Sequence, residues 1–190
     1  ALYRPGRPAP DLAQLRREAL QRETEAKIQA QLAALRSGRT SALRLDGEGM
    51  PELPLSLLSE TGWAQVGIYW MSLRELPAAC AGWTKVESLT ASNQLEPLTV
   101  AQGALDLPKL KRLEITNARI LTLPLHFAVV PSIQELHVQN NRLRELPSGW
   151  GAAGRLTTVF LWNNRIRVLP SDIGAAPSLT TLNCSGNMLT

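Results

Sequence analysis

Apolar residues recur along this chain at a fixed spacing. Five Leu-Pro pairs, those that begin at residues 53, 76, 123, 146 and 169, follow one another in steps of 23, 47, 23 and 23. Val100 divides the long step into 24 and 23, with the extra residue near the stretch QLEPL. Six repeats therefore start at residues 53, 76, 100, 123, 146 and 169, after a half-repeat, and each follows the pattern LPxxIxxLxxLxxLxLxxNxLxx. A repeat of this length predicts a solenoid over residues 40–190.

Three positions of each repeat, the eleventh, fourteenth and sixteenth, are apolar in all six copies. The last two alternate with their neighbours, which is the period of a short strand with one buried face. Such strands are too short to be stable alone, so stacked copies must form one parallel sheet over a continuous core. We expect an α/β solenoid, shaped as a horseshoe with a concave parallel sheet and tight outer turns. The predicted core residues are Trp63, Val66, Ile68, Val86, Leu89, Ala91, Leu110, Leu113, Ile115, Ile133, Leu136, Val138, Leu156, Val159, Leu161, Leu179, Leu182 and Cys184.

The nineteenth position is asparagine in the last three repeats, at Asn141, Asn164 and Asn187. A buried amide there can pair with backbone groups of its own turn and of the neighbouring turn, so we predict a structural role. The pattern fails upstream, and less regular turns are expected where the position is held by Met71 and Ala118 and where the second repeat offers Asn93 or Gln94 out of step.

Residues 11–36 contain no Gly or Pro and are dense in residues that favour helices. Asp11 is an N-cap candidate and Gly38 is a stop signal. The apolar residues of the two halves lie on slightly different faces, which predicts a bend near Thr24. We expect residues 11–39 to form a helical cap over the first strand, behind a Pro-rich linker at residues 1–10.

The net charge of +4 and the pI near 9.5 raise the question of nucleic acid binding. Residues 1–40 hold eight Lys or Arg against four Asp or Glu, whereas residues 41–190 hold twelve of each. A repeat region without net charge is a poor phosphate-binding surface. A nucleic-acid arm on the helical segment is the alternative, but mixed charge on a helix favours a solvated face. We therefore expect no nucleic acid partner.

The sequence has no run of about 18 apolar residues and no signal-peptide pattern at its start, so we expect no membrane span. It lacks an initiator Met and stops in mid-repeat, so we expect a piece of a longer protein. Cys80 and Cys184 lie in different repeats, which argues against a disulfide scaffold and fits a reducing compartment. Both are interpreted as core residues.

Candidate catalytic chemistry is sparse. No phosphate-binding loop ending in Lys-Ser or Lys-Thr is present, and metal ligands are few. Glu114 and His137 occupy the same outward column one repeat apart, but a catalytic dyad would also need a nucleophile such as Thr116 or Thr90. An exposed ion pair is the more common arrangement. We predict no catalytic residues, no metal and no cofactor.

Residues that alternate with the core positions point to the concave face, and these columns are chemically mixed. Trp, Tyr and Arg are over-represented at the energetic centres of protein interfaces. We predict that Phe160 and Trp162 anchor a protein partner, while Glu114, His137 and Arg142 set its orientation near the rim. Further candidate contacts are Gln139, Thr116, Tyr69 and Trp70. For the last two, the alternative is that their rings pack over the first repeat or against the cap.

The repeats resemble those of the leucine-rich-repeat family over about three quarters of the chain. A helical cap that leads into ALRLDGEGMPELP and then into LP-initiated repeats further resembles the LPX-type effectors that Gram-negative pathogens inject through type III secretion. The resemblance implies that the repeats recognise a host protein and that a C-terminal domain, often a novel E3 ubiquitin ligase, carries any activity. The 23-residue repeats depart from the form of about 20 residues in many such effectors. They are similar to plant intracellular Ras-group repeats and to effectors of plant-associated bacteria.

The catalytic cysteine of those ligases lies in a Cys-x-Asp motif, whereas this chain has CAG at Cys80 and CSG at Cys184. The leading hypothesis is thus a non-enzymatic domain of a bacterial effector, secreted into the host cytoplasm or nucleus, that binds a host protein through its concave face. One alternative is an autoinhibitory domain that masks a C-terminal catalytic domain of its own chain. Another is an intracellular scaffold of the Ras-group type.

Overall fold

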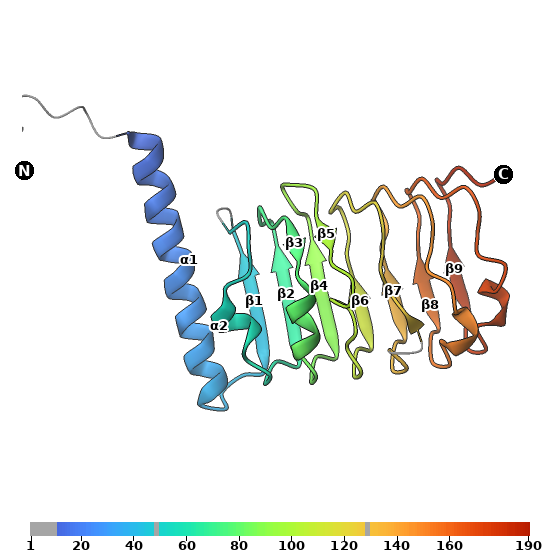
Figure 1. The fold of residues 1–190 in the computed structure, drawn as a ribbon, viewed down its shortest axis with the longest axis horizontal. Helices are drawn as coiled ribbons and strands as arrows, with labels where there is room; N and C mark the ends of the chain where they lie inside the picture. Colours follow the sequence, from blue (N-terminus) through green and yellow to red (C-terminus); the bar gives the residue numbers. More distant parts are fainter. Residues whose placement is uncertain (1–10, 48–49, 128–129) are drawn as a thin grey trace, which may run out of the picture.

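The computed structural model describes residues 11–47, 50–127 and 130–190. Its main element is one parallel sheet of seven strands, laid side by side in chain order after a long helix α1 (Leu12–Arg36) (Figure 1). The strands are β1 (Ala42–Asp46), β2 (Gln65–Tyr69), β4 (Ser88–Ser92), β6 (Arg112–Glu114), β7 (Glu135–His137), β8 (Thr158–Phe160) and β9 (Thr181–Asn183). The predicted solenoid with a parallel sheet and an N-terminal helix is confirmed. The Pro-rich segment 1–10 lies outside the described residues.

The register of the sheet repeats the sequence period. Partners are 23 residues apart between β1 and β2, as in Leu43 and Val66, and again from β6 through β9. The offset is still 23 at the end of β4, where Ser92 pairs with Tyr69. It has become 24 in the small second sheet, formed by β3 (Glu75–Leu76) and β5 (Thr99–Val100). The extra residue therefore enters within residues 93–98, the segment that contains QLEPL.

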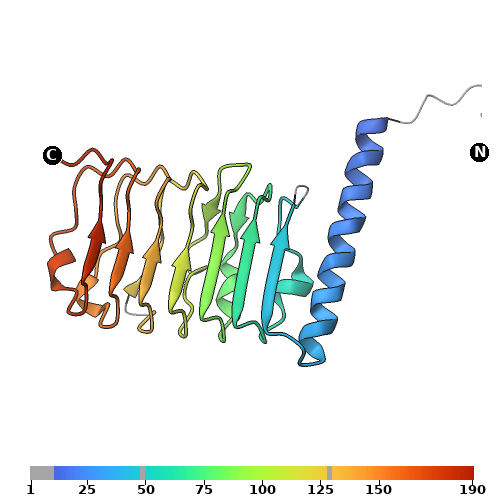
Figure 2. The ribbon, with the colours of Figure 1, turned by 180° about the vertical axis from the view of Figure 1, so that it is seen from behind.

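The opposite side of the solenoid consists of short turns and helices. These are α2 (Leu55–Leu58), η1 (Ala78–Gly82), η3 (Trp150–Ala152) and η4 (Ile173–Ala175). Figures 1 and 2 show them on one side of the sheet, which leaves the other face of the strands free of covering helices. The free face is the predicted concave surface.

The predicted core columns are buried in the first five repeats, and Trp63, Trp83 and Trp150 are fully enclosed between the sheet and the outer turns. The prediction was wrong for the sixth repeat, where Leu179 and Cys184 are only partly buried and Leu182 is exposed. The physical reason is that no strand of the described residues packs on the far side of β9. A repeat buries its core only against a neighbour.

Helix α1 is continuous from Leu12 to Arg36, so the predicted bend near Thr24 was wrong. The Thr24 hydroxyl donates a hydrogen bond to the carbonyl of Leu20 (2.8 Å) and stays within the helix. Asp11 is the N-cap, as predicted, and its carboxylate accepts from the amide of Ala13 at 2.9 Å. The C-terminal half of the helix packs on the first strand, while the N-terminal half stands clear of the sheet (Figures 1 and 2).

Asparagines at the nineteenth position form the predicted ladder of buried amides. The Asn141 side chain donates to the carbonyls of Ile115 (2.6 Å) and Val138 (3.0 Å), in the preceding turn and in its own. Its oxygen accepts from the amides of Ala118 and Ile120. Asn164 and Asn187 donate to the corresponding carbonyls one and two repeats later, and each accepts from one amide, that of Leu143 or Ile166.

Gln94 belongs to this ladder, contrary to the expectation that the second repeat is out of step. Its amide nitrogen donates to the carbonyls of Ile68 and Ser92, which occupy the places that Ile115 and Gln139 have around Asn141. Its oxygen is buried without a partner among the described residues. The longer side chain of Gln94 therefore donates to the two carbonyls, but its oxygen accepts no hydrogen bond from the backbone amides of the turn.

Candidate functional site

The concave face is built from the side chains of the strands that point away from the core. Because parallel strands pair in register, residues of equal repeat position form columns across the sheet, about 4.8 Å apart from strand to strand. The column of the fifteenth position places Glu114 opposite His137 and His137 opposite Phe160. Each predicted contact on the strands therefore has a defined neighbour.

Charged residues gather in the middle of the face. Arg112 forms an ion pair with Glu135 on the next strand and a second one with Glu114 (3.0 Å), and His137 Nε2 lies 3.1 Å from the Glu135 carboxylate. Sequence reasoning missed Arg112 and Glu135, which occupy the thirteenth position. The signal was available, because the alternation of a strand places that position on the same face.

Glu114 and His137 are register partners but not a hydrogen-bonded dyad. The carboxylate of Glu114 is bound by Arg112, and the imidazole of His137 faces Glu135. The nearest candidate nucleophile is also engaged, since the Thr116 hydroxyl donates to the Ser92 hydroxyl at 2.9 Å. The cluster is a network of ion pairs that fixes side-chain positions in the centre of the face.

Phe160 and Trp162 both project from the concave side of β8 and its continuation. Both rings are partly buried, although the alternation of the strand alone would leave them without apolar cover on this face. The Phe160 ring meets the His137 ring edge to face, with centroids 4.9 Å apart. The His137 ring is itself held by Glu135, so the charged network supports the aromatic pair.

Gln139 lies one repeat before Trp162 and is partly buried. The backbone amide of the next residue, Asn140, donates to the carbonyl of Trp162 (3.0 Å), which fixes the two segments side by side. The side-chain oxygen of Gln139 is buried and has no hydrogen-bond partner among the described residues. An unpaired buried acceptor costs stability, and this one lies below the surface that a partner would contact.

Tyr69 and Trp70 differ in their surroundings. The Tyr69 ring lies over Gly67, where an added Cβ would come within 2.6 Å of the ring, and the Arg44 guanidinium stands 4.7 Å from its centroid. Tyr69 thus packs on the first two strands, as one of the two interpretations predicts. Trp70 is 58% exposed and has a left-handed backbone, with φ of 54°.

The eighteenth position is left-handed in every repeat. The same conformation occurs at Asn93, Asn117, Asn140, Asn163 and Gly186. Asn and Gly tolerate this region best, so the backbone conformation accounts for the asparagines and the glycine of this column. Two pairs of these asparagines also bond to each other, at 3.0 Å each.

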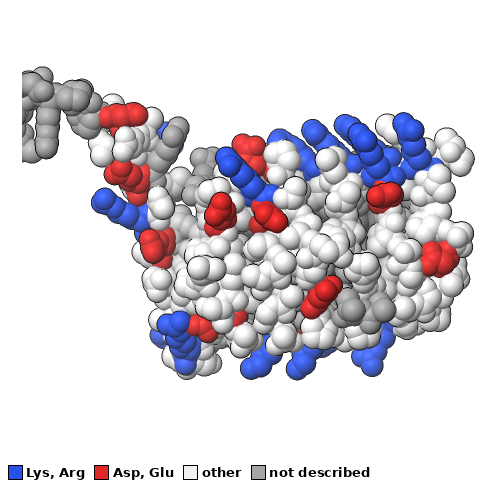
Figure 3. All heavy atoms as spheres, viewed as in Figure 1, with Lys and Arg blue, Asp and Glu red and all other residues white. Residues whose placement is uncertain are grey.

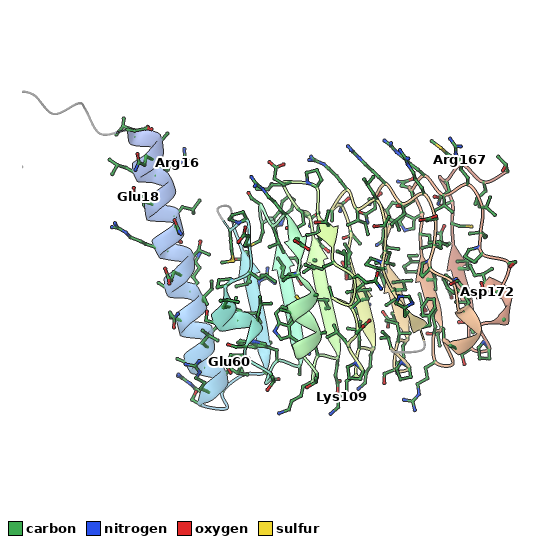
Figure 4. All side chains as sticks on the ribbon, viewed as in Figure 1. Arg16, Glu18, Glu60, Lys109, Arg167 and Asp172 are labelled. Carbon is green, nitrogen blue, oxygen red and sulfur yellow. The ribbon has the colours of Figure 1, made fainter. Side chains whose placement is uncertain are left out.

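Arg142 lies outside the sheet, on the edge where the chain leaves the strands. It belongs to an exposed column with Arg119 and Arg165. Figure 3 shows Lys and Arg side chains in a row along this upper edge, and Figure 4 labels Arg167 there. Arg142 is therefore placed at the rim of the concave face.

Other chemistry is limited in the part of the chain that the structure describes. Burial raises the pKa of the Cys80 thiol to about 12, so it is not a ready nucleophile. No group of three or more His, Cys, Asp or Glu within residues 11–47, 50–127 and 130–190 could hold a metal ion. No helix among the described residues is both long and apolar enough to cross a membrane.

The fold is similar to solved leucine-rich-repeat structures. A leucine-rich-repeat protein of Leptospira interrogans matches with a TM-score of 0.67 and 22% identity, covering 74% of this chain and 36% of that one. Internalin C2 of Listeria monocytogenes matches with a TM-score of 0.59 and 20% identity, covering 71% and 57%. A chain of the Toll–Spatzle complex of Drosophila matches at 0.54 and 21%, covering 80% and 25%.

This chain therefore spans less than two thirds of the length of each of these proteins. No protein-family model matches the chain, and no curated protein sequence is significantly similar to it. The likeness at these identities concerns the fold. The chain folds as a leucine-rich-repeat solenoid with an N-terminal helix.

Proposed function

We propose that this chain is a protein-recognition module that binds its partner through the concave face, with Phe160 and Trp162 as the central anchors. The observation that carries the proposal is the arrangement around β8, where two partly exposed rings stand side by side on a rigid sheet. Large aromatic side chains, Trp above all, are over-represented at the energetic centres of interfaces.

Glu114 and Arg142 orient the partner around the anchors, while His137 is buried against the Phe160 ring and positions it. Arg112 holds Glu114 and Glu135 holds His137, so little side-chain freedom is lost on binding. Thr116 is buried and bonds to Ser92, so it supports the face from within. Solved proteins of similar fold support the assignment, since one is a chain of the Toll–Spatzle complex and another is the plant receptor RGFR1 with the hormone RGF2.

The finer proposal concerns the biological setting. The LP-initiated repeats and the helix that precedes them favour the repeat domain of a bacterial type III effector that acts on a host protein in the host cytoplasm or nucleus. In that setting the domain selects the target and is not itself an enzyme. A C-terminal ligase of the same chain would then act on the bound protein.

The test replaces the anchors with the residues of the next repeat, Phe160→Asn and Trp162→Ser. Both side chains lie outside the core, so the melting temperature should stay nearly unchanged. A matched control, Leu55→Asn with Val168→Ser, removes exposed apolar surface elsewhere. Wild-type and variant chains are immobilised on resin and incubated with plant and animal cell lysates. The retained proteins are then quantified by mass spectrometry.

A protein retained by the wild type and the control but lost by the anchor variant is then purified and measured by calorimetry. Its affinity should weaken by about 2 kcal/mol, or roughly thirtyfold. A purified partner that binds the folded anchor variant with full affinity would disprove this interface and move it toward Tyr69 and Trp70.

A further inference from the structure

Four arginines form a compact group on the edge where the chain leaves the strands. Arg142 and Arg144 follow β7, and Arg165 and Arg167 take the same positions after β8. All four are exposed. The residue between each pair, Leu143 or Ile166, is fully buried, so the two arginines of a pair project outward on either side of a core anchor. We call these four residues the arginine block.

Backbone bonds fix the two pairs side by side. The amide of Arg165 donates to the carbonyl of Leu143 (2.8 Å), and the amide of Met188 donates to that of Ile166 (2.9 Å). The amide ladder adds a second restraint, since Asn164 accepts from the amide of Leu143 and Asn187 from that of Ile166, each at 3.0 Å. The four arginine side chains therefore extend from a rigid backbone, and the two pairs lie about 5 Å apart.

The arginine block is not neutralised by ion pairs. None of its members forms an ion pair with a described carboxylate, although the exposed Glu145 follows Arg144 in the chain, whereas Arg44, Lys111 and Arg112 all form one. Three of its members and Met188 line a hollow of about 330 Å³ that holds no acidic side chain. Figure 3 shows the row of basic side chains on this edge, and Figure 4 labels Arg167 within it. Like charges held together in this way favour an external anion.

We infer that the arginine block binds an acidic segment of a protein, an extended stretch with two or more Asp or Glu side chains. The planar guanidinium matches a carboxylate in two parallel hydrogen bonds. The hollow provides space for one or two carboxylates between the rows, with the exposed Met188 side chain as its apolar wall. This site is separate from the anchors on the concave face, and it can exist whether or not those anchors bind.

A polypeptide fits the site better than a nucleic acid. Residues 41–190 hold equal numbers of basic and acidic residues. A long polyanion would therefore extend beyond the arginine block onto a surface without net positive charge. No aromatic side chain lines the hollow, and single-stranded nucleic acids are usually held by bases stacked on aromatic rings. A short acidic stretch needs neither feature.

The test uses the whole chain and a fluorescently labelled hexaglutamate peptide with blocked ends, titrated by anisotropy at about 50 mM and 200 mM salt. Arg165→Gln with Arg167→Gln should weaken binding at least about tenfold. The matched control is Lys109→Gln with Arg155→Gln, two exposed basic residues at the tenth position of their repeats. It makes the same change in net charge, and Lys109 lies on the opposite edge (Figure 4). The control should change the affinity by less than about twofold.

Three results would overturn the inference. The first is no binding of the peptide to the wild-type chain at low salt. The second is equal weakening in the block variant and the control, because that would reveal attraction by net charge alone. The third is tighter binding of a labelled thymidine oligonucleotide of equal charge, lost in the same block variant, because that would identify a nucleic acid site. Thermal melting of each variant confirms that the exposed substitutions leave the fold intact.

Discussion

The two ends of the solenoid present the same kind of strand in different surroundings. At the N-terminal end, the core side chains of β1, Leu43 and Leu45, are 2% and 3% exposed beneath α1. At the other end, Leu182 in β9 is 37% exposed and Leu189 is 42% exposed. Because the repeat pattern is equal at both ends, the difference comes from what packs against the terminal strand.

Helix α1 covers both kinds of surface that a terminal strand exposes. Ile28 and Leu32 cover the apolar side chains. The Gln31 amide pairs with the backbone of Arg44, donating to its carbonyl (2.5 Å) and accepting from its amide (2.6 Å), as a neighbouring strand would. The ion pair between Arg36 and Glu60 attaches the end of the helix to the outer turn. The cap thus replaces a missing repeat in packing and in hydrogen bonding.

The largest effect should follow from removing this cap. Deletion of residues 1–39 exposes Leu43, Leu45 and Val66 and should lower the free energy of unfolding by several kcal/mol, since each buried aliphatic side chain contributes about 1.5 to 3 kcal/mol. Thermal and urea unfolding measure the loss.

A shorter deletion, residues 1–22, is the control for the cap. It removes the part of α1 that carries the exposed Leu12 and keeps Ile28, Gln31 and Leu32 in place. It should therefore change the melting temperature little. If the long deletion also changed the melting temperature by no more than a degree or two, α1 would not stabilise the solenoid. Its basic residues would then be candidates for a binding role.

A second contrast lies within the amide ladder. Asn141 is buried between two complete turns, whereas Asn187 is only partly buried at the open end. Asn141→Ala leaves several buried backbone groups unpaired and should cost about 3 kcal/mol, while Asn187→Ala should cost about 1 kcal/mol. Urea unfolding of the two variants at constant m-value checks the order. Equal losses would mean that burial does not decide what the ladder contributes.

The fold was largely predictable because the repeats encode it many times. A core column that is apolar in every copy leaves one way to bury the strands, and a segment without Gly or Pro before them predicts a helical cap. The error at Leu182 arose because periodicity reports what a residue is suited for, while burial also requires a neighbour on each side.

The candidate site was predictable only in part. The columns could be assigned from alternation, but the partners of Glu114 and His137 depend on side-chain rotamers that the spacing does not determine. The Phe160 ring is partly buried for the same reason, because it packs on the His137 ring. Gln94 was misjudged because its side chain is one carbon longer than asparagine, and that difference is accommodated only by the local path of the turn.

Trp70 gives the smallest expected effect and the sharpest comparison between repeats. It holds the left-handed position that Asn or Gly occupies in every later repeat, and a bulky side chain there costs about 1 kcal/mol. Trp70→Gly should therefore raise the free energy of unfolding by about 1 kcal/mol. Trp70→Ala is the control, because it removes the exposed ring but keeps the Cβ that causes the strain, and it should bring no gain. If both variants gained equally, the exposed ring and not the backbone would be the source of the cost. A gain limited to glycine would instead show that the chain keeps a strained, exposed aromatic beside its first strands at the expense of stability, and Trp70 would then be the next residue to test for partner contact.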